Sequence, residues 1–163
     1  MKIEGIVIAH LFDGNVLCPG FPVTITNLIT SIGDQMVQKK VSGAGTVSTT
    51  IAGMKLGSST VTTTKTGIAA YIGTTCYIAS SAITFATGFP TIGTTLNAME
   101  MKSNWATGLV TGTVAEIAIV NNNTDAGEAD ETGTFARVLF PAPFVMTTVN
   151  KLDATWIWTF IGS

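Results

Sequence analysis

Residues 97–121 constrain the fold more than any other part of the chain, because they read as two strands joined by a glycine-containing loop. Apolar and polar side chains alternate from Met99 to Trp105, and again from Ala115 to Ile119. Successive side chains of a strand point to opposite faces of a sheet, so this alternation predicts one apolar face turned inward and one polar face turned outward. The link at residues 106–112 carries two glycines, which predicts a hairpin with a loop longer than two residues.

The stretch from Leu152 to Ile161 predicts a central strand, because aromatic residues alternate with Thr and Ile and both faces are apolar. Short strands separated by turns that contain Gly and Pro favour a mainly β fold, either a sandwich or a barrel. Of these we expect an antiparallel, jelly-roll-like β-sandwich. The side chains predicted for its core are Ile32, Met36, Met99, Met101, Trp105, Ile117, Ile119, Trp156, Trp158 and Phe160.

Residues 27–42 predict one amphipathic helix. Its apolar residues, from Leu28 to Val37, recur at helical spacing on one face. Thr26 or Asn27 is expected to cap its start, and Gly43 is expected to end it. We expect this helix to cover one face or one end of a sheet within a single domain formed by residues 27–163.

Residues 1–26 alternate weakly as far as Phe12 and then break at two prolines. This pattern favours an extended N-terminal arm that reaches onto a neighbouring molecule, or else the first strand of the local sheet. An arm could be removed, up to Phe21, with loss of binding and without unfolding of the domain. The residues predicted for such an interface are Ile3, Ile6, Ile8, His10, Phe12 and Phe21.

Charged residues make up only 11% of the chain, against roughly 25% in a typical soluble domain. A free monomer keeps itself soluble with surface charge, so this deficit favours a protein whose exterior is covered by other subunits. A secreted β-domain with an uncharged polar face is the alternative. The net charge is −2 and the basic residues form no run beyond Lys39–Lys40, so no nucleic-acid partner is expected. Neither a signal peptide nor a membrane-spanning apolar stretch is expected.

No catalytic residue, cofactor site or metal site is predicted. His10 is the only histidine, and no acidic residue stands at a spacing that would pair with it. The acidic run at residues 121–133 does not match the ligand positions of a calcium loop, so it predicts a solvated loop. The two cysteines, Cys18 and Cys76, are expected to be buried thiols, although the spacing also permits a disulfide. We therefore expect a protein that is not an enzyme.

Glu116 interrupts the apolar strand VAEIAIV. We expect it to face outward and to form a structural ion pair, either with Lys102 across the hairpin or with Arg137.

Four segments, taken in their order, resemble a family of tailed-bacteriophage virion structural proteins. These are NLITSIG, MKLGSSTVTTTKTG, WATGLVTGTVAEIAIVNN and the C-terminal TFARVLFPAPFVMTTVNKLDATWIWTFIG, which together span residues 27–162. The TWIWTF sequence departs from the family in lacking small residues before the final strand, and residues 1–26 carry no match.

The resemblance implies a non-enzymatic virion part, expected to be a capsid decoration (cement) protein made in the host cytoplasm. Its implied partners are the major capsid protein and copies of itself. A tail, baseplate or fibre-adaptor component is the alternative from the same particle. A receptor- or carbohydrate-binding module is a further alternative, and it would need an exposed aromatic side chain such as Trp105, Tyr71 or Tyr77.

Overall fold

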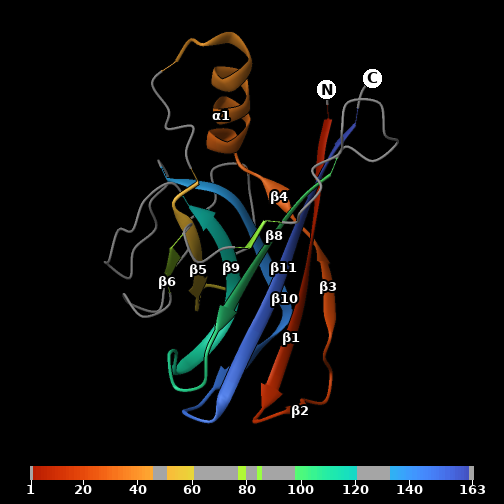
Figure 1. The fold of residues 1–163 in the computed structure, drawn as a ribbon, viewed down its shortest axis with the longest axis vertical. Helices are drawn as coiled ribbons and strands as arrows, with labels where there is room; N and C mark the ends of the chain where they lie inside the picture. The colour runs from red at the N-terminus through yellow and green to blue at the C-terminus, as the bar shows by residue number, and fades with distance from the viewer. Residues whose placement is uncertain are drawn as a thin grey trace.

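The structure is a computed structural model that describes residues 2–45, 51–60, 77–79, 84–85, 98–120 and 133–161. These residues form two antiparallel sheets and one helix, α1 (Ser31–Ser42), which stands at one end (Figure 1). The mainly β fold with a helix is therefore confirmed. The strands are β1 (Lys2–Asp13), β2 (Val16–Leu17), β3 (Val23–Thr26), β4 (Leu28–Ile29), β5 (Gly53–Gly57), β6 (Tyr77–Ala79), β7 (Thr84–Phe85), β8 (Ala98–Trp105), β9 (Gly112–Val120), β10 (Thr134–Met146) and β11 (Asn150–Ile161).

Sheet A has the strand order β2-β1-β11-β8-β7, and β3 also pairs with β1. Sheet B has the order β4-β10-β9-β5-β6. The chain passes from sheet A to sheet B between β3 and β4 and between β8 and β9, and it returns between β6 and β7 and between β10 and β11. Both the β8–β9 and the β10–β11 connections lie at the end of the molecule opposite α1 (Figure 1).

The N-terminal segment is a central strand of sheet A. β1 pairs with β11 over its whole length, from Lys2 opposite Ile161 to Asp13 opposite Asn150, and it pairs with β3 on its other side. Of the two forms expected for residues 1–26, an arm and a strand of the local sheet, the described part takes the second. Removal of this segment would take away the partner of β11 and β3, so the pairing argues against the expectation that the domain survives its loss.

The hairpin predicted for residues 97–121 is also wrong. β8 pairs with β11 in sheet A, whereas β9 pairs with β10 and β5 in sheet B. Both segments are strands and both have an apolar inner face, as their alternation requires. However, the link between them carries the chain from sheet A to sheet B. Gly108 and Gly112, in this link and at its end, have positive φ angles of 77° and 125°.

Helix α1 begins four residues later than the predicted start at residue 27. Leu28 and Ile29 form β4 and pair with Arg137 and Ala136 of β10, so the apolar pair that fitted the helical spacing belongs to a sheet. Thr30 is the N-cap, and its Oγ1 accepts a hydrogen bond from the backbone N–H of Gly33. Gly43 ends the helix in the left-handed region, as predicted.

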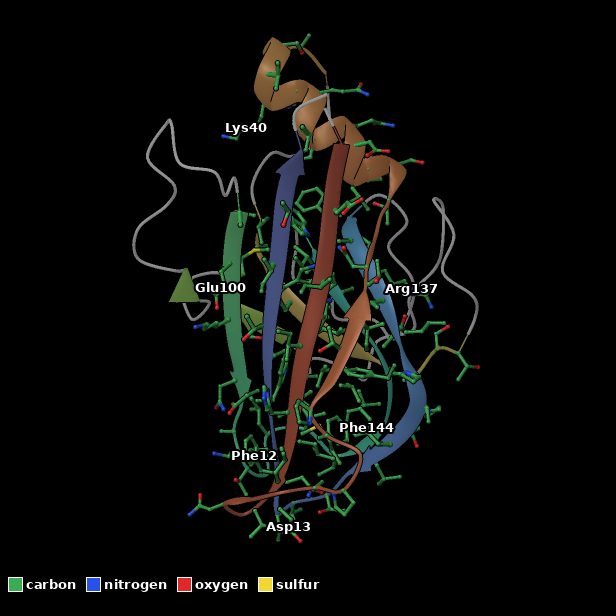
Figure 2. All side chains as sticks on the ribbon, turned by 90° about the vertical axis from the view of Figure 1, so that its right-hand side faces the viewer. Phe12, Asp13, Lys40, Glu100, Arg137 and Phe144 are labelled. Atoms are coloured by element: carbon green, nitrogen blue, oxygen red, sulfur yellow. The ribbon has the colours of Figure 1, made fainter. Side chains whose placement is uncertain are left out.

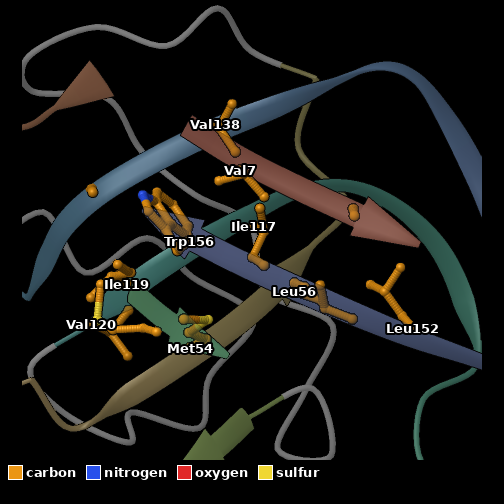
Figure 3. Close-up of a cluster of buried hydrophobic side chains, with 14 of the residues drawn as sticks. Val7, Met54, Leu56, Ile117, Ile119, Val120, Val138, Leu152 and Trp156 are labelled. Atoms are coloured by element: carbon orange, nitrogen blue, oxygen red, sulfur yellow. The ribbon is translucent and has the colours of Figure 1, made fainter. Parts of the chain in front are cut away.

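The core lies between the inner faces of the two sheets. Val7, Leu152 and Trp156 of sheet A face Met54 and other apolar residues of sheet B in Figure 3. Of the ten residues predicted for the core, Ile32 and Met99 are partly buried, and the side chain of Phe160 lies outside the described part. The other seven are buried: Met36, Met101, Trp105, Ile117, Ile119, Trp156 and Trp158.

Within the described residues, the structure contains no helix that is long and apolar enough to cross a membrane.

Candidate functional site

One broad surface of the molecule is a sheet face that α1 does not cover, since α1 packs against β10 and β4 of sheet B. Val7, Ala9 and Leu11 of β1 are buried in the core, so the residues between them point away from it. The register of β3, β8 and β11 extends this surface across sheet A. We call it the outer face of sheet A; its members are Glu4, Ile6, Ile8, His10, Phe12, Thr24, Thr26, Glu100, Lys102, Asn104, Lys151, Asp153, Thr155, Ile157 and Thr159.

The centre of this face is apolar and its border is polar. Ile6 lies opposite Ile157, Ile8 lies opposite Thr155, and all four side chains are partly exposed. Exposed threonines of β3 and exposed polar residues of β8 flank them. An apolar centre within a polar rim is the usual anatomy of a protein–protein interface.

The charges on the outer face of sheet A are largely compensated within the face itself. Lys102 Nζ lies 2.9 Å from Glu100 Oε1. Asn104 donates a hydrogen bond to the carboxylate of Asp153. Lys151 Nζ lies 4.6 Å from the centre of the Phe12 ring, a cation–π contact. The face has three carboxylates and two lysines, so its charges nearly balance and it carries little net charge to attract a nucleic acid or another highly charged partner.

Four of the six predicted interface residues meet on this face. Ile6, Ile8, His10 and Phe12 follow one another along β1, and the rings of His10 and Phe12 stack with centroids 6.2 Å apart. They come together because every second residue of a strand shares a face, which is a signal that the sequence already carried.

The other two predicted interface residues are placed differently. Phe21 lies before β3 and packs edge-on against Phe144 of β10, with ring centroids 5.2 Å apart. It is partly buried against the edge of the core and is not on the outer face of sheet A. Ile3 is in β1 and its backbone pairs with Phe160. Its side chain lies outside the described part.

The register also brings His10 directly opposite Asp153 of β11. Sequence reasoning found no acidic partner for His10, because the two residues belong to strands at opposite ends of the chain. Both side chains are partly exposed on the outer face of sheet A.

A second polar cluster lies on the side of sheet B that faces away from the core. The Arg137 Nε–Glu116 Oε2 distance is 2.5 Å, and both side chains are fully buried. Ser59 covers the pair: its backbone N–H donates to Glu116 Oε1 at 3.2 Å, and its Oγ accepts from Arg137 Nη2 at 3.3 Å. Lys55 lies opposite Ala118 on the same side of the sheet and is 1% exposed.

The Glu116–Arg137 pairing is one of the two that the sequence predicted, but the predicted outward, solvated position of Glu116 is wrong. Residues after β5 lie over this side of sheet B and bury it, and Lys102 is in the other sheet. Both side chains of the pair are shielded from solvent, so a substrate could not reach them. The arrangement is that of a structural ion pair.

Trp105 is fully buried in the core, so it cannot stack on a sugar ring at the surface. Tyr71 and the side chain of Tyr77 lie outside the described part.

No group of three or more His, Cys, Asp or Glu side chains lies together in the described ranges. The acidic run at residues 121–132 falls outside those ranges, as does Cys76, while Cys18 is partly buried against the core.

Comparisons of this chain with protein-family models, curated proteins and solved structures found no match.

Proposed function

We propose that this chain is a non-enzymatic structural subunit of a tailed-bacteriophage virion, and specifically a capsid decoration (cement) protein that binds the assembled shell through the outer face of sheet A. The observation that carries the proposal is this face itself. It is broad and centred on Ile6, Ile8 and Ile157, and its charges are engaged within the face. The assignment to a tailed-bacteriophage virion rests on the resemblance of four sequence segments to virion proteins.

Composition supports the same proposal. Only 11% of the residues are charged, and several of these are already used in contacts within the chain, including Arg137 with Glu116 and Lys102 with Glu100. A protein with so little free surface charge is suited to an exterior that is covered by neighbouring subunits.

The action proposed for the protein is mechanical. Each copy would bury the apolar centre of its outer face against the major capsid protein, at about 25 cal/mol for each Å² of apolar surface removed from water. A contact repeated by many copies over a closed shell resists expansion of that shell, even when each single contact is weak. The proposal includes the finer description of the fold as a jelly-roll-like β-sandwich, in which one sheet is free to bind because the other carries α1.

The first test is the number of copies in a purified particle, measured by quantitative mass spectrometry against the major capsid protein. We expect about one copy for each capsid subunit. A ratio of only a few copies for each particle would favour a tail, baseplate or fibre-adaptor component. Absence of the protein from the particle would refute the assignment to a virion.

The second test addresses the outer face of sheet A. Shells that lack the protein are incubated with purified Ile8→Lys and Ile157→Lys variants, which place a cation in the apolar centre. We expect each variant to bind at least tenfold more weakly than the unaltered protein. Val41→Lys is the matched control, because Val41 is an exposed apolar residue on α1. Unfolding temperatures close to that of the unaltered protein show that the variants fold. Equal binding by all three variants would refute the outer face as the binding surface.

A further inference from the structure

The exposed apolar side chains of the described residues are concentrated at the end of the molecule opposite α1. Six large apolar residues are well exposed, and one of them, Val41, is on the helix. The other five lie in or beside the turns at the opposite end, where Figure 1 places β2 and the connections between the sheets. We call these five the apolar end; they are Val16 (71% exposed), Leu17 (38%), Leu109 (39%), Val145 (61%) and Val149 (52%).

Hydrogen bonds and close contacts join the three turns of the apolar end. The backbone N–H of Gly14, in the β1–β2 turn, donates to the carbonyl of Val149 in the β10–β11 turn. Asn150 Nδ2 donates to the carbonyl of Phe12, which fixes the same two turns. Gly108, in the β8–β9 connection, is so close to Thr148 that an added Cβ would lie 3.5 Å from its carbonyl oxygen. A surface fixed in this way loses little conformational freedom when it binds.

The segments that build this end carry no charge. Residues 14–22, 106–113 and 141–149 contain no Asp, Glu, Lys or Arg. The charged residues next to these segments in the sequence are Asp13, which Figure 2 shows at this end, and Lys151, whose Nζ lies 4.6 Å from the centre of the Phe12 ring. Helix α1, at the other end, carries Asp34, Lys39 and Lys40, and Figure 2 shows Lys40 there.

We propose that the apolar end is a self-association surface, which packs against the apolar end of a second copy of this chain. In a two-fold contact the residues near the axis meet their own copies, and like charges there are costly. Three uncharged turns avoid that cost. A membrane is a poorer fit, because segments that lie on a bilayer surface have Lys and Arg beside their apolar residues, and this end has one lysine, which is held by Phe12.

The size of the surface sets the strength of the contact. A stable standard interface uses roughly 800 Å² and 20–30 residues of each partner. The apolar end offers five aliphatic side chains, so the contact is weak and forms where copies are concentrated. This inference is independent of the proposed function, since it concerns a different surface and is tested on the free protein without any shell.

The experiment is sedimentation equilibrium of the full chain from about 10 µM to about 1 mM, a range suited to a weak contact. We expect reversible, concentration-dependent self-association that 1 M NaCl does not weaken, because the contact is apolar. Val145→Asp and Val16→Asp place a carboxylate in the contact, and each raises the dissociation constant at least tenfold. Val41→Asp, on α1 at the far end, is equally exposed and leaves association unchanged. Unfolding temperatures show that all three variants are folded.

Several results would overturn the proposal. These are a monomer at every concentration, unaltered association of both Val145→Asp and Val16→Asp, or an equal loss in Val41→Asp. A monomer that floats with phosphatidylcholine vesicles, and no longer does so after Val145→Asp, would assign the apolar end to a membrane instead. An Ile8→Lys variant that self-associates normally would separate this surface from the outer face of sheet A.

Discussion

Replacement of Glu116 tests how far one carboxylate balances the buried charges of sheet B. Lys55 of β5 and Arg137 of β10 both lie opposite Ala118 of β9, on its two sides. Glu116 is two residues further along β9 on the same side of the sheet, so it is diagonal to both cations, at roughly 7–8 Å between Cα atoms. Lys55 and Arg137 are at most 1% exposed, and Glu116 is fully buried.

The two single replacements are expected to differ in cost. Glu116→Gln keeps the shape of the side chain but leaves two buried cations without this carboxylate, which should lower the free energy of unfolding by about 4–5 kcal/mol, the upper part of the range for a broken buried pair. Arg137→Met removes one cation, and the carboxylate of Glu116 keeps the hydrogen bond from the backbone N–H of Ser59. We therefore expect a smaller loss, about 2–3 kcal/mol.

The double variant Glu116→Gln with Arg137→Met combines the same two replacements; it removes both charges of the pair and the hydrogen bond from Arg137 Nη2 to Ser59 Oγ. It should cost less than the sum of the single variants, because neither charge of the Glu116–Arg137 pair is left behind without the other. Equilibrium unfolding in urea measures all three values. With a slope of about 2 kcal/mol per molar urea, Glu116→Gln lowers the midpoint by about 2 M.

Two results would show that this reasoning is wrong. One is a loss of less than about 1 kcal/mol for Glu116→Gln, which would mean that the pair is not effectively buried. The other is additive costs in the double variant, because coupled charges cannot give additive free energies.

The remaining predictions concern packing at α1 and β1. Gly33→Ala should lower the free energy of unfolding, measured in urea, by about 1–3 kcal/mol, because the added Cβ would lie 2.2 Å from the carbonyl oxygen of Phe135. This cost outweighs the higher helix propensity of Ala. Gln38→Ala, at an exposed position of the same helix, is the control and should have no such cost. Thr30→Val should cost about 1–2 kcal/mol through loss of the N-cap, whereas Thr30→Ser keeps the cap; equal unfolding midpoints for the two would argue against the cap. Gly5→Ala should lower the unfolding temperature because its Cβ would overlap the amide of Asn27, and Asn27→Ala in the same chain should restore part of the loss; no restoration would place the strain elsewhere.

The sequence was sufficient to identify most strands but not their partners. Alternation from Met99 to Trp105 and from Ala115 to Ile119 reports which faces are buried, and the structure agrees for the inner face of each strand. Alternation contains no information on pairing. A glycine-containing link of this length suits a hairpin and equally suits a crossing between two sheets.

The same limit explains two other differences. Leu28 and Ile29 have helical spacing with Ile32, but hydrogen bonding to β10 outweighed helix propensity and made them a strand. Glu116 was expected in solvent because it interrupts an apolar strand. Its contact with Ser59, which is distant in the sequence, is one that no local pattern signals.

The candidate interface was predictable as a row of residues on one strand but not as a surface. Ile6, Ile8, His10 and Phe12 share a face through strand periodicity alone. Ile157 and Asp153 join them because β1 pairs with β11, a pairing between chain positions that local patterns cannot reveal.

The pairing of β1 with β11 also determines when sheet A can form. Phe12 and Asn150 are hydrogen-bonded across 138 positions of the chain. During synthesis at about 5–20 residues per second, β1 emerges from the ribosome first and waits several seconds for the strand that completes its ladder. Long-range pairing of this kind slows folding and leaves an unpaired strand edge exposed in the nascent chain. A chain cut short before β11 lacks the centre of sheet A, and with it the outer face, so only chains that reach β11 can enter an assembly through that face.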